Sequence, residues 1–172
     1  ARLQIRPIRR RYAYNRLMNH TVFLAFGSNL GNRRENIERA LELLRQEGLK
    51  PVSVSQPVAT APEGFASANE FLNSAAKFTT ALSPHEALEV TQRTERIPED
   101  AEGIYHDRTI DIDILFYDDI VLNTPELSIP HPRMAERMFV LSPMNEIAPA
   151  LRHPANGKTI HELYMEAKQG KR

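Results

Sequence analysis

The sequence predicts an α+β domain in which a mainly antiparallel sheet is flanked by helices. Runs of apolar or alternating residues are separated by two stretches with helical spacing, which gives the order β-α-β-β-α-β. The chain of 172 residues is long enough to bury a sizeable core, and no internal repeat follows residue 17. We therefore expect a single domain over residues 18–172.

The predicted strands are short apolar or alternating runs bounded by turn-forming residues. They lie at residues 21–26, 52–58, 71–79 and 108–116. Both predicted helices begin with capping signals. Asn32 with Glu35 opens the first helix, and Ser83 with Pro84 and Glu86 opens the second.

The remaining segments complete this order. Residues 60–69 contain proline and glycine and predict a loop. After residue 116, an Asp-Asp turn leads into a short apolar run, residues 138–147 add apolar side chains to the core, and residues 159–167 predict a C-terminal helix. The order of elements matches the split β-α-β motif of the ferredoxin-like fold.

The charge distribution separates the N-terminus from the rest of the chain. Residues 1–17 contain six arginines and no acid, and we interpret them as a disordered or expression-derived basic extension. Of the 22 Lys and Arg residues, 16 then remain against 22 acids, and this acidic body argues against broad nucleic-acid binding. No apolar run reaches the roughly 18 residues of a membrane span. The lack of cysteine excludes a thiolate metal site and fits a cytoplasmic protein.

The most informative stretch is 108–113, Arg-Thr-Ile-Asp-Ile-Asp. A period of two places Asp111 and Asp113 on one face of a strand, roughly 6 to 7 Å apart, with the isoleucines on the other. Such close like charges become favourable around a hard divalent cation, and Arg108 is placed to bind an anion that the cation also holds. Metal plus anion indicates phosphate chemistry, whereas the structural alternative is a half-buried strand with a solvated acidic face.

Four weaker signals accompany this stretch. The turn 27–30 joins a strand to a helix, where backbone amides can receive an anion, although such turns often carry Gly and Asn for their permissive dihedrals. His131 lies between two prolines and is either a donor on a stiff segment or a turn histidine. Gln92 and Glu95 lie three apart near a helix end, and Arg137 places a cation near an aromatic residue.

Several motifs occur together in a characteristic order. They are Phe26-Gly27-Ser28-Asn29-Leu30-Gly31, Thr60 before Pro62, Phe71-Leu72-Asn73, Gln92 with Glu95, Arg108-Thr109-Ile110-Asp111-Ile112-Asp113, Ile129-Pro130-His131 and Arg137 before Phe139. From Thr21 to about His161, the chain closely resembles the 6-hydroxymethyl-7,8-dihydropterin pyrophosphokinases of folate biosynthesis. Enzymes of that family move the terminal diphosphate of ATP onto the pterin hydroxymethyl group and leave AMP.

The resemblance implies a role for each matched residue. Asp111 and Asp113 would hold two Mg²⁺ ions that bridge the phosphates of the co-substrate ATP, and with Arg108 they would form the catalytic group. The matched positions around ATP are Gln92, Glu95, Arg108, His131 and Arg137. The matched positions around the pterin are Thr60, Phe71, Asn73, Tyr105 and Phe139. We expect only small-molecule partners, ATP and hydroxymethyl dihydropterin, with no nucleic acid or membrane partner, and a monomer rather than an oligomer.

The chain departs from the family pattern between Glu95 and Arg108. The family usually carries a pair of arginines and a tryptophan there, whereas residues 96–107 contain one arginine and additional acids, with Tyr105 at the position of the tryptophan. Two other functions stay open. A nucleotidyltransferase is one, because Gly27-Ser28 before an Asp-x-Asp strand loosely echoes that superfamily. A non-catalytic ferredoxin-like ligand-binding module is the other, since this fold carries many functions.

Overall fold

The computed structural model describes residues 19–60, 70–96 and 110–170. The predictions made for the basic extension 1–17 and for most of the acidic loop 96–107 therefore lie outside the described residues. The elements in chain order are β1 (His20–Ser28), α2 (Arg33–Gln46), β2 (Lys50–Val54), β3 (Val58–Thr60), β4 (Phe71–Thr80), α3 (Pro84–Glu95), β5 (Asp111–Tyr117), β6 (Leu122–Asn123), β7 (Ser128–Ile129), the 3₁₀ helix η2 (Met134–Glu136), α4 (Met138–Ile147) and α5 (Ile160–Lys168).

The main sheet confirms the predicted α+β class. Its strand order is β2-β4-β1-β5, β3 also pairs with β4, and every pairing is antiparallel. Helix α2 connects β1 to β2 across β4, and helix α3 connects β4 to β5 across β1. These two split β-α-β crossovers are the ferredoxin-like arrangement.

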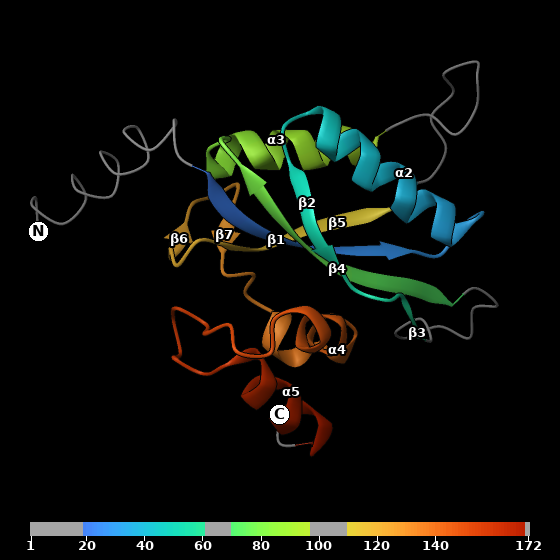
Figure 1. Cartoon of the computed structure of the whole chain (residues 1–172). Helices are drawn as coiled ribbons and strands as arrows, with labels where there is room; N and C mark the ends of the chain where they lie inside the picture. Colours follow the sequence, from blue (N-terminus) through green and yellow to red (C-terminus); the bar gives the residue numbers. More distant parts are fainter. Residues whose placement is uncertain (1–18, 61–69, 97–109, 171–172) are drawn as a thin grey trace, which may run out of the picture.

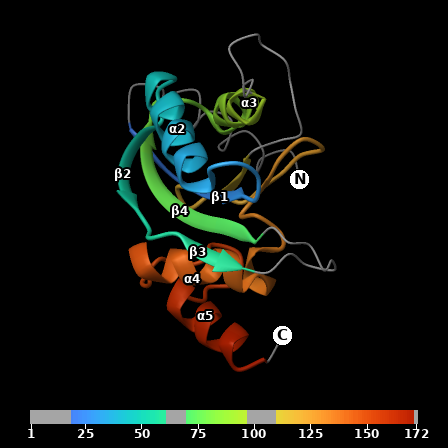
Figure 2. The ribbon, with the colours of Figure 1, turned by 90° about the vertical axis from the view of Figure 1, so that its right-hand side faces the viewer.

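The sheet lies between two helical layers (Figures 1 and 2). Helices α2 and α3 cover one face, where they bury a core that includes Leu24, Phe26, Leu44 and Ile112. Helices α4 and α5 cover the other face, over a second core built around residues such as Leu115. Because both faces of the central strands β1 and β4 are covered, those strands are buried along most of their length.

The capping predictions agree with the structure. Asn32 Oδ1 accepts a hydrogen bond from Glu35 N at 3.1 Å at the start of α2. Ser83 and Glu86 form a reciprocal capping box at the start of α3. Each bond satisfies a backbone donor that the helix itself leaves unpaired. The two helices therefore begin where the sequence placed them.

Two predicted elements are wrong in detail. The strand predicted at 52–58 is two strands, β2 and β3, and residues 55–57 between them belong to neither strand. The turn 27–30 is also partly strand, because β1 continues through Ser28. In both places the pairing with β4 decides where a strand ends, and local sequence does not contain that information.

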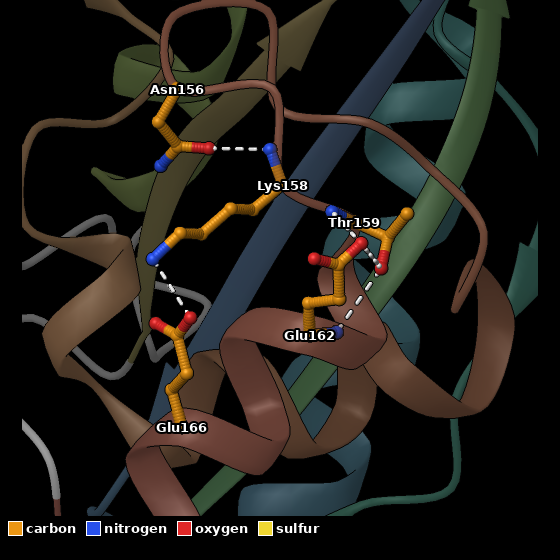
Figure 3. A network of polar contacts seen from close by, with 5 residues as sticks. All are labelled: Asn156, Lys158, Thr159, Glu162 and Glu166. Atoms are coloured by element: carbon orange, nitrogen blue, oxygen red, sulfur yellow. Dashed lines mark hydrogen bonds and ion pairs between the residues drawn. The ribbon is translucent and has the colours of Figure 1, made fainter.

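The C-terminal segment is fastened by short polar contacts (Figure 3). Thr159 and Glu162 form a capping box at the start of α5, and Asn156 Oδ1 accepts a hydrogen bond from Lys158 N at 2.9 Å. Lys158 Nζ pairs with Glu166 Oε1 at 2.7 Å, which ties the preceding turn to the helix. No helix within the described ranges has the length and apolar character needed to cross a membrane.

Candidate active site

The two aspartates of β5 share one face of the sheet. Asp111 lies opposite Gly27 and Asp113 lies opposite Ala25, whereas Ile112 packs into the core under α2 and α3. Antiparallel partners share a face, so both carboxylates lie on the side of the sheet that carries α4 and α5. Asp111 is exposed and Asp113 is half-buried. The predicted alternation is thus confirmed, with both carboxylates at least partly accessible to solvent.

Gly27 lies between the acidic strand β5 and the buried amide of Asn73 on β4. Its neighbours across the sheet are Asn73 on β4 and Asp111 on β5. A Cβ atom at Gly27 would lie 3.3 Å from Asn73 Oδ1 and 3.7 Å from Phe71 Cδ1. The absence of a Cβ at Gly27 therefore lets the Asn73 amide lie close to the backbone of β1. The sequence pointed to Gly27 as part of an anion-binding turn, and this spatial role was missed.

Thr60 and Asn73, both predicted to bind the pterin, lie side by side. Asn73 Nδ2 donates to Thr60 Oγ1 at 2.8 Å and to the carbonyl of Val58 at 3.3 Å. Both bonds engage the amide nitrogen, so they fix which way the amide of this buried residue faces. Phe71 lies opposite Thr60 in the strand pairing and shares that face. These three predicted pterin residues therefore form one cluster.

His131 is held against the acidic strand by a β-bulge. The pairing of β1 with β5 shifts by one residue at Leu115, and the Leu115 carbonyl accepts a hydrogen bond from His131 N at 3.0 Å. The ring atom Nδ1 accepts from Arg133 N at 3.2 Å, which leaves Nε2 to carry the proton of the neutral ring. Burial lowers the pKa of His131 most strongly; nearby Asp113 raises it, and Arg137 and Arg133 lower it. His131 is therefore a neutral hydrogen-bond donor near pH 7.

Arg137 precedes α4 and has a buried donor that needs a partner. Its guanidinium carbon lies 5.5 Å from the ring centroid of Phe139. Its Nε is buried and has no hydrogen-bond partner among the described residues. A buried donor of a cation without a partner is costly, so such a group is well suited to receive an anionic ligand. Arg137 and Phe139 were both predicted as site residues, and the structure places them in contact.

The two predicted residues on α3 differ in their surroundings. Glu95 Oε1 accepts a hydrogen bond from Ile112 N at 2.7 Å, so it binds the backbone of the residue between the two aspartates. Gln92 is exposed one turn earlier on the same helix. Sequence spacing paired these residues without showing that Glu95 reaches β5. Their roles towards ATP stay predictions.

The sequence profile described as 7,8-dihydro-6-hydroxymethylpterin-pyrophosphokinase matches residues 23–149 of this chain. The chain belongs to this family. The match extends from within β1 to beyond the end of α4, and it includes every described residue of the candidate site.

Individual relatives agree with this membership. A protein of Porphyromonas gingivalis named 2-amino-4-hydroxy-6-hydroxymethyldihydropteridine pyrophosphokinase is 40% identical over 138 residues, covering 77% of this chain and 93% of the relative. A Bacillus subtilis protein of the same name is 40% identical over 132 residues, covering 76% and 79%. A folic acid synthesis protein of Dictyostelium discoideum is 35% identical over 153 residues, which cover 88% of this chain but 23% of that protein.

Solved structures of family members share the fold. The Plasmodium falciparum HPPK-DHPS wild type with pteroate has a TM-score of 0.72 at 16% identity, covering 90% of this chain and 46% of that one. An HPPK-DHPS in complex with substrates has a TM-score of 0.69 at 16% identity, covering 89% and 44%. At this identity the likeness establishes the ferredoxin-like fold.

The acidic pair supplies too few ligands to enclose a cation by itself. Within the part of the chain that the structure describes, no group of three or more His, Cys, Asp or Glu side chains could hold a metal ion. Two carboxylates on an open face nevertheless fit Mg²⁺, which usually binds one or two carboxylates and takes its other ligands from phosphates and water. The donor chemistry therefore suits a metal that arrives with a nucleotide.

Two predicted site residues, Arg108 and Tyr105, lie outside the described residues. Arg108 immediately precedes the strand, and Tyr105 was predicted to replace a tryptophan of the family pattern. Both keep the roles that the resemblance implies as predictions. The other predicted site residues lie on several elements: Thr60 on β3, Phe71 and Asn73 on β4, Gln92 and Glu95 on α3, Asp111 and Asp113 on β5, His131 and Arg137 before α4, and Phe139 in α4.

Proposed function

We propose that this protein transfers the diphosphate of ATP to the hydroxymethyl group of 6-hydroxymethyl-7,8-dihydropterin and releases AMP, as a step in folate biosynthesis. The observation that carries the proposal is the row formed by Asn73, Gly27 and Asp111 across three neighbouring strands. At one end of this row lies the amide of Asn73, which can form hydrogen bonds with a heterocycle. At the other end lies the carboxylate of Asp111, which can hold a metal ion bound to phosphate. Gly27, which has no side chain, lies between them and lets the Asn73 amide approach the β1 backbone closely.

In the proposed reaction the hydroxymethyl oxygen of the pterin attacks the β-phosphorus of ATP. The bond between that phosphorus and the oxygen bridging to the α-phosphate breaks, AMP leaves, and the hydroxyl proton is released. Asp111 and Asp113 would hold two Mg²⁺ ions, which supply charge stabilisation for the phosphates when bound. Catalysis would consist mainly of positioning the substrates and stabilising developing charge.

The proposed ATP site uses the cationic and hydrogen-bonding groups around the acidic pair. Arg137 offers its buried Nε and His131 offers the Nε2 proton of a neutral ring to phosphate oxygens. Gln92, Glu95 and Arg108 complete this set by their match to the family motif. The lowered pKa of His131 keeps the ring uncharged, so it contributes as a donor at neutral pH.

The proposed pterin site lies on the side of Gly27 away from the acidic pair. The Asn73 amide, oriented by Thr60, would donate to and accept from the ring edge. The flat ring would stack on Phe71 and Phe139, with Tyr105 as a further aromatic wall. We also propose that the enzyme works in the cytoplasm, which is consistent with its lack of cysteine, and we favour a monomer.

Product analysis tests the proposal directly. The protein is incubated with ATP, Mg²⁺ and hydroxymethyl dihydropterin, and we expect AMP and a pterin diphosphate in equal amounts. Release of inorganic pyrophosphate in place of AMP would identify a nucleotidyltransferase. Nucleotide binding without turnover would indicate a non-catalytic module.

Variants of the acidic pair test the metal assignment. Asp111→Ala and Asp113→Ala should each lower turnover by at least about a hundredfold, because metal-mediated charge stabilisation is worth several kcal/mol. The fold should persist, since Asp111 is exposed and Asp113 half-buried. Asp119→Ala, in the exposed turn after β5, is the matched control and should be as active as the wild type. Full activity of either site variant would contradict the assignment.

A further inference from the structure

The strand that carries Thr60 changes register immediately before it. In β2, Val54 lies opposite Ala76, whereas in β3, Val58 lies opposite Asn73. Between these two pairs, the chain advances by four residues from β2 to β3 but by only three residues along β4. Antiparallel partners share a face, so this single extra residue reverses the face on which every later side chain of the strand lies. Pro57 lies within the break and has no backbone N–H to give to a ladder.

Two buried serines, Ser55 and Ser74, form the hydrogen bonds that stabilise this change of register. Ser55 N donates to the Ala75 carbonyl at 2.8 Å, which continues the β2 register. The return bond from Ala75 N goes to Ser55 Oγ at 2.9 Å rather than to the Ser55 carbonyl. The displaced Ser55 carbonyl accepts from Ser74 Oγ at 3.2 Å, and the two hydroxyl oxygens lie 3.0 Å apart. The Ser55 hydroxyl thus takes the place of its own carbonyl in the ladder, and Ser74 satisfies the carbonyl that turns away.

Glu146 of α4 satisfies the next amide. Gln56 N has left the ladder and donates to both carboxylate oxygens of Glu146, at 2.9 Å and 3.3 Å. Bonds from a backbone amide to a carboxylate are charge-assisted and stronger than neutral ones. The same helix α4 begins beside Arg137 and Phe139, so Glu146 also links the break to the element that carries these site residues. Figure 2 shows β3 and α4 side by side.

The break determines which side chain reaches Asn73. In the observed register Thr60 lies opposite Phe71, on the face that carries Asn73, and its hydroxyl accepts from Asn73 Nδ2. If the β2 register continued unbroken, Ala59 would lie opposite Phe71. Thr60 would then face the layer of α2 and α3, away from Asn73.

We propose that Ser55, Ser74 and Glu146 are positioning residues that lock this register and thereby set the orientation of the pterin-reading amide of Asn73. The role given to Asn73 rests on the proposed function, whereas the register lock is a property of the fold. None of the three residues needs to touch the substrate. Their effect passes through Thr60, which fixes the rotation of the Asn73 amide.

The register is measured first, without substrate. Ser55→Ala and Ser74→Ala are compared with the wild type by nuclear Overhauser contacts between β3 and β4 in labelled protein. We expect the Thr60–Phe71 cross-strand contact in the wild type and an Ala59–Phe71 contact in the variants. Ser53→Ala, in β2 before the break, is the matched control and should keep the wild-type pattern. Wild-type contacts in both site variants would overturn the proposal.

The kinetic test compares the effect of each substitution on the KM for the pterin with its effect on the KM for ATP. Ser55→Ala and Ser74→Ala should raise the KM for the pterin about tenfold, the cost of one or two weakened hydrogen bonds, with the KM for ATP within about twofold of wild type. Equal rises for both substrates would show a general loss of structure and overturn the proposal. Ser55→Thr retains the hydroxyl and should recover most of the pterin affinity.

If the serine variants do not fold, variants of Glu146 test the proposal instead. The Glu146 side chain is exposed, so its substitution should leave the fold intact. Glu146→Ala should raise the pterin KM about threefold, and Glu146→Gln, which retains an acceptor, should raise it less. An unchanged pterin KM in Glu146→Ala would count against the lock. If the wild-type protein made no AMP, the proposed function would fail, while the nuclear Overhauser comparison would still decide whether the register is locked.

Discussion

His131 donates its backbone N–H to the carbonyl of Leu115 at 3.0 Å, and Leu115 is the extra residue of the bulge in β5. A regular strand would present this carbonyl elsewhere, because a bulge disrupts the ladder and bends the strand locally. The bulge therefore connects the strand of the acidic pair to the segment that carries the histidine. This relationship places one of the predicted ATP contacts next to Asp113.

The pKa of His131 should lie below its ordinary value of about 6.5 in the metal-free protein, because burial opposes the charged ring and Nδ1 already accepts from Arg133 N. Nuclear magnetic resonance titration of the ring measures this, with His131→Gln to assign the signal. Asp113→Asn should lower the pKa further, since Asp113 raises it. A pKa at or above 6.5 in the wild type would contradict the prediction.

The same shift has a consequence for stability. Between the lowered folded-state pKa and about 6.5, the unfolded chain binds a proton that the folded protein does not. The contribution of His131 to the free energy of unfolding is therefore fully present above pH 6.5 and decreases as the pH falls through that range. Urea unfolding at several pH values should show a smaller decrease in His131→Gln than in the wild type.

Glu95→Ala should weaken Mg–ATP binding about tenfold, because a residue that orients metal-binding groups typically contributes that much or more. Glu95 holds the backbone of Ile112, between the two aspartates, and its loss would free this part of an edge strand. Calorimetric titration measures the affinity. Glu89→Ala, an exposed acid on the same helix, serves as the control and should bind like the wild type. Identical affinities for the two variants would refute this role for Glu95.

Gly27→Ala should raise the KM for the pterin about tenfold while leaving the fold intact. The added Cβ would lie 3.3 Å from Asn73 Oδ1, so the amide must move, and small displacements of positioning groups are costly. Gly27 is not among the glycines with positive φ, and strand backbone accepts alanine. The KM for ATP serves as the internal control. An unchanged pterin KM would show that the contact between Gly27 and Asn73 does not affect the pterin site.

Thr159→Ala should lower the free energy of unfolding by about 1 kcal/mol, the usual cost of losing an N-cap. Thr159 Oγ1 accepts from Glu162 N at 3.1 Å at the start of α5 (Figure 3). Thr159→Ser retains the hydroxyl and should stay within a few tenths of a kcal/mol of the wild type. Denaturant unfolding compares the three proteins. A loss of stability as large in the serine variant as in the alanine variant would show that the cap is not responsible.

Local patterns in the sequence were sufficient for helices α2, α3 and α5 and for the alternation of the acidic strand, whereas residues 138–147, which form α4, were expected only to add apolar side chains to the core. Capping signals at Asn32 and Ser83 concern bonds within three residues, and the alternation around Asp111 reflects which face of one strand is buried. The cluster of Thr60 with Asn73 was predicted only through resemblance to a family. Strand pairing brings these two residues together, and their spacing in the sequence does not indicate it.

The sequence by itself determined the α+β class, the sharing of one strand face by Asp111 and Asp113, and the residues that match the family motif. The tertiary structure decided where the strands change register, and three such places are at Leu115, between Pro51 and Ser53, and after Ser55. Register depends on bonds to a neighbouring strand that is distant in the chain. A change of one residue reverses a face, so these bonds, rather than local propensity, determine which side chains meet in the site.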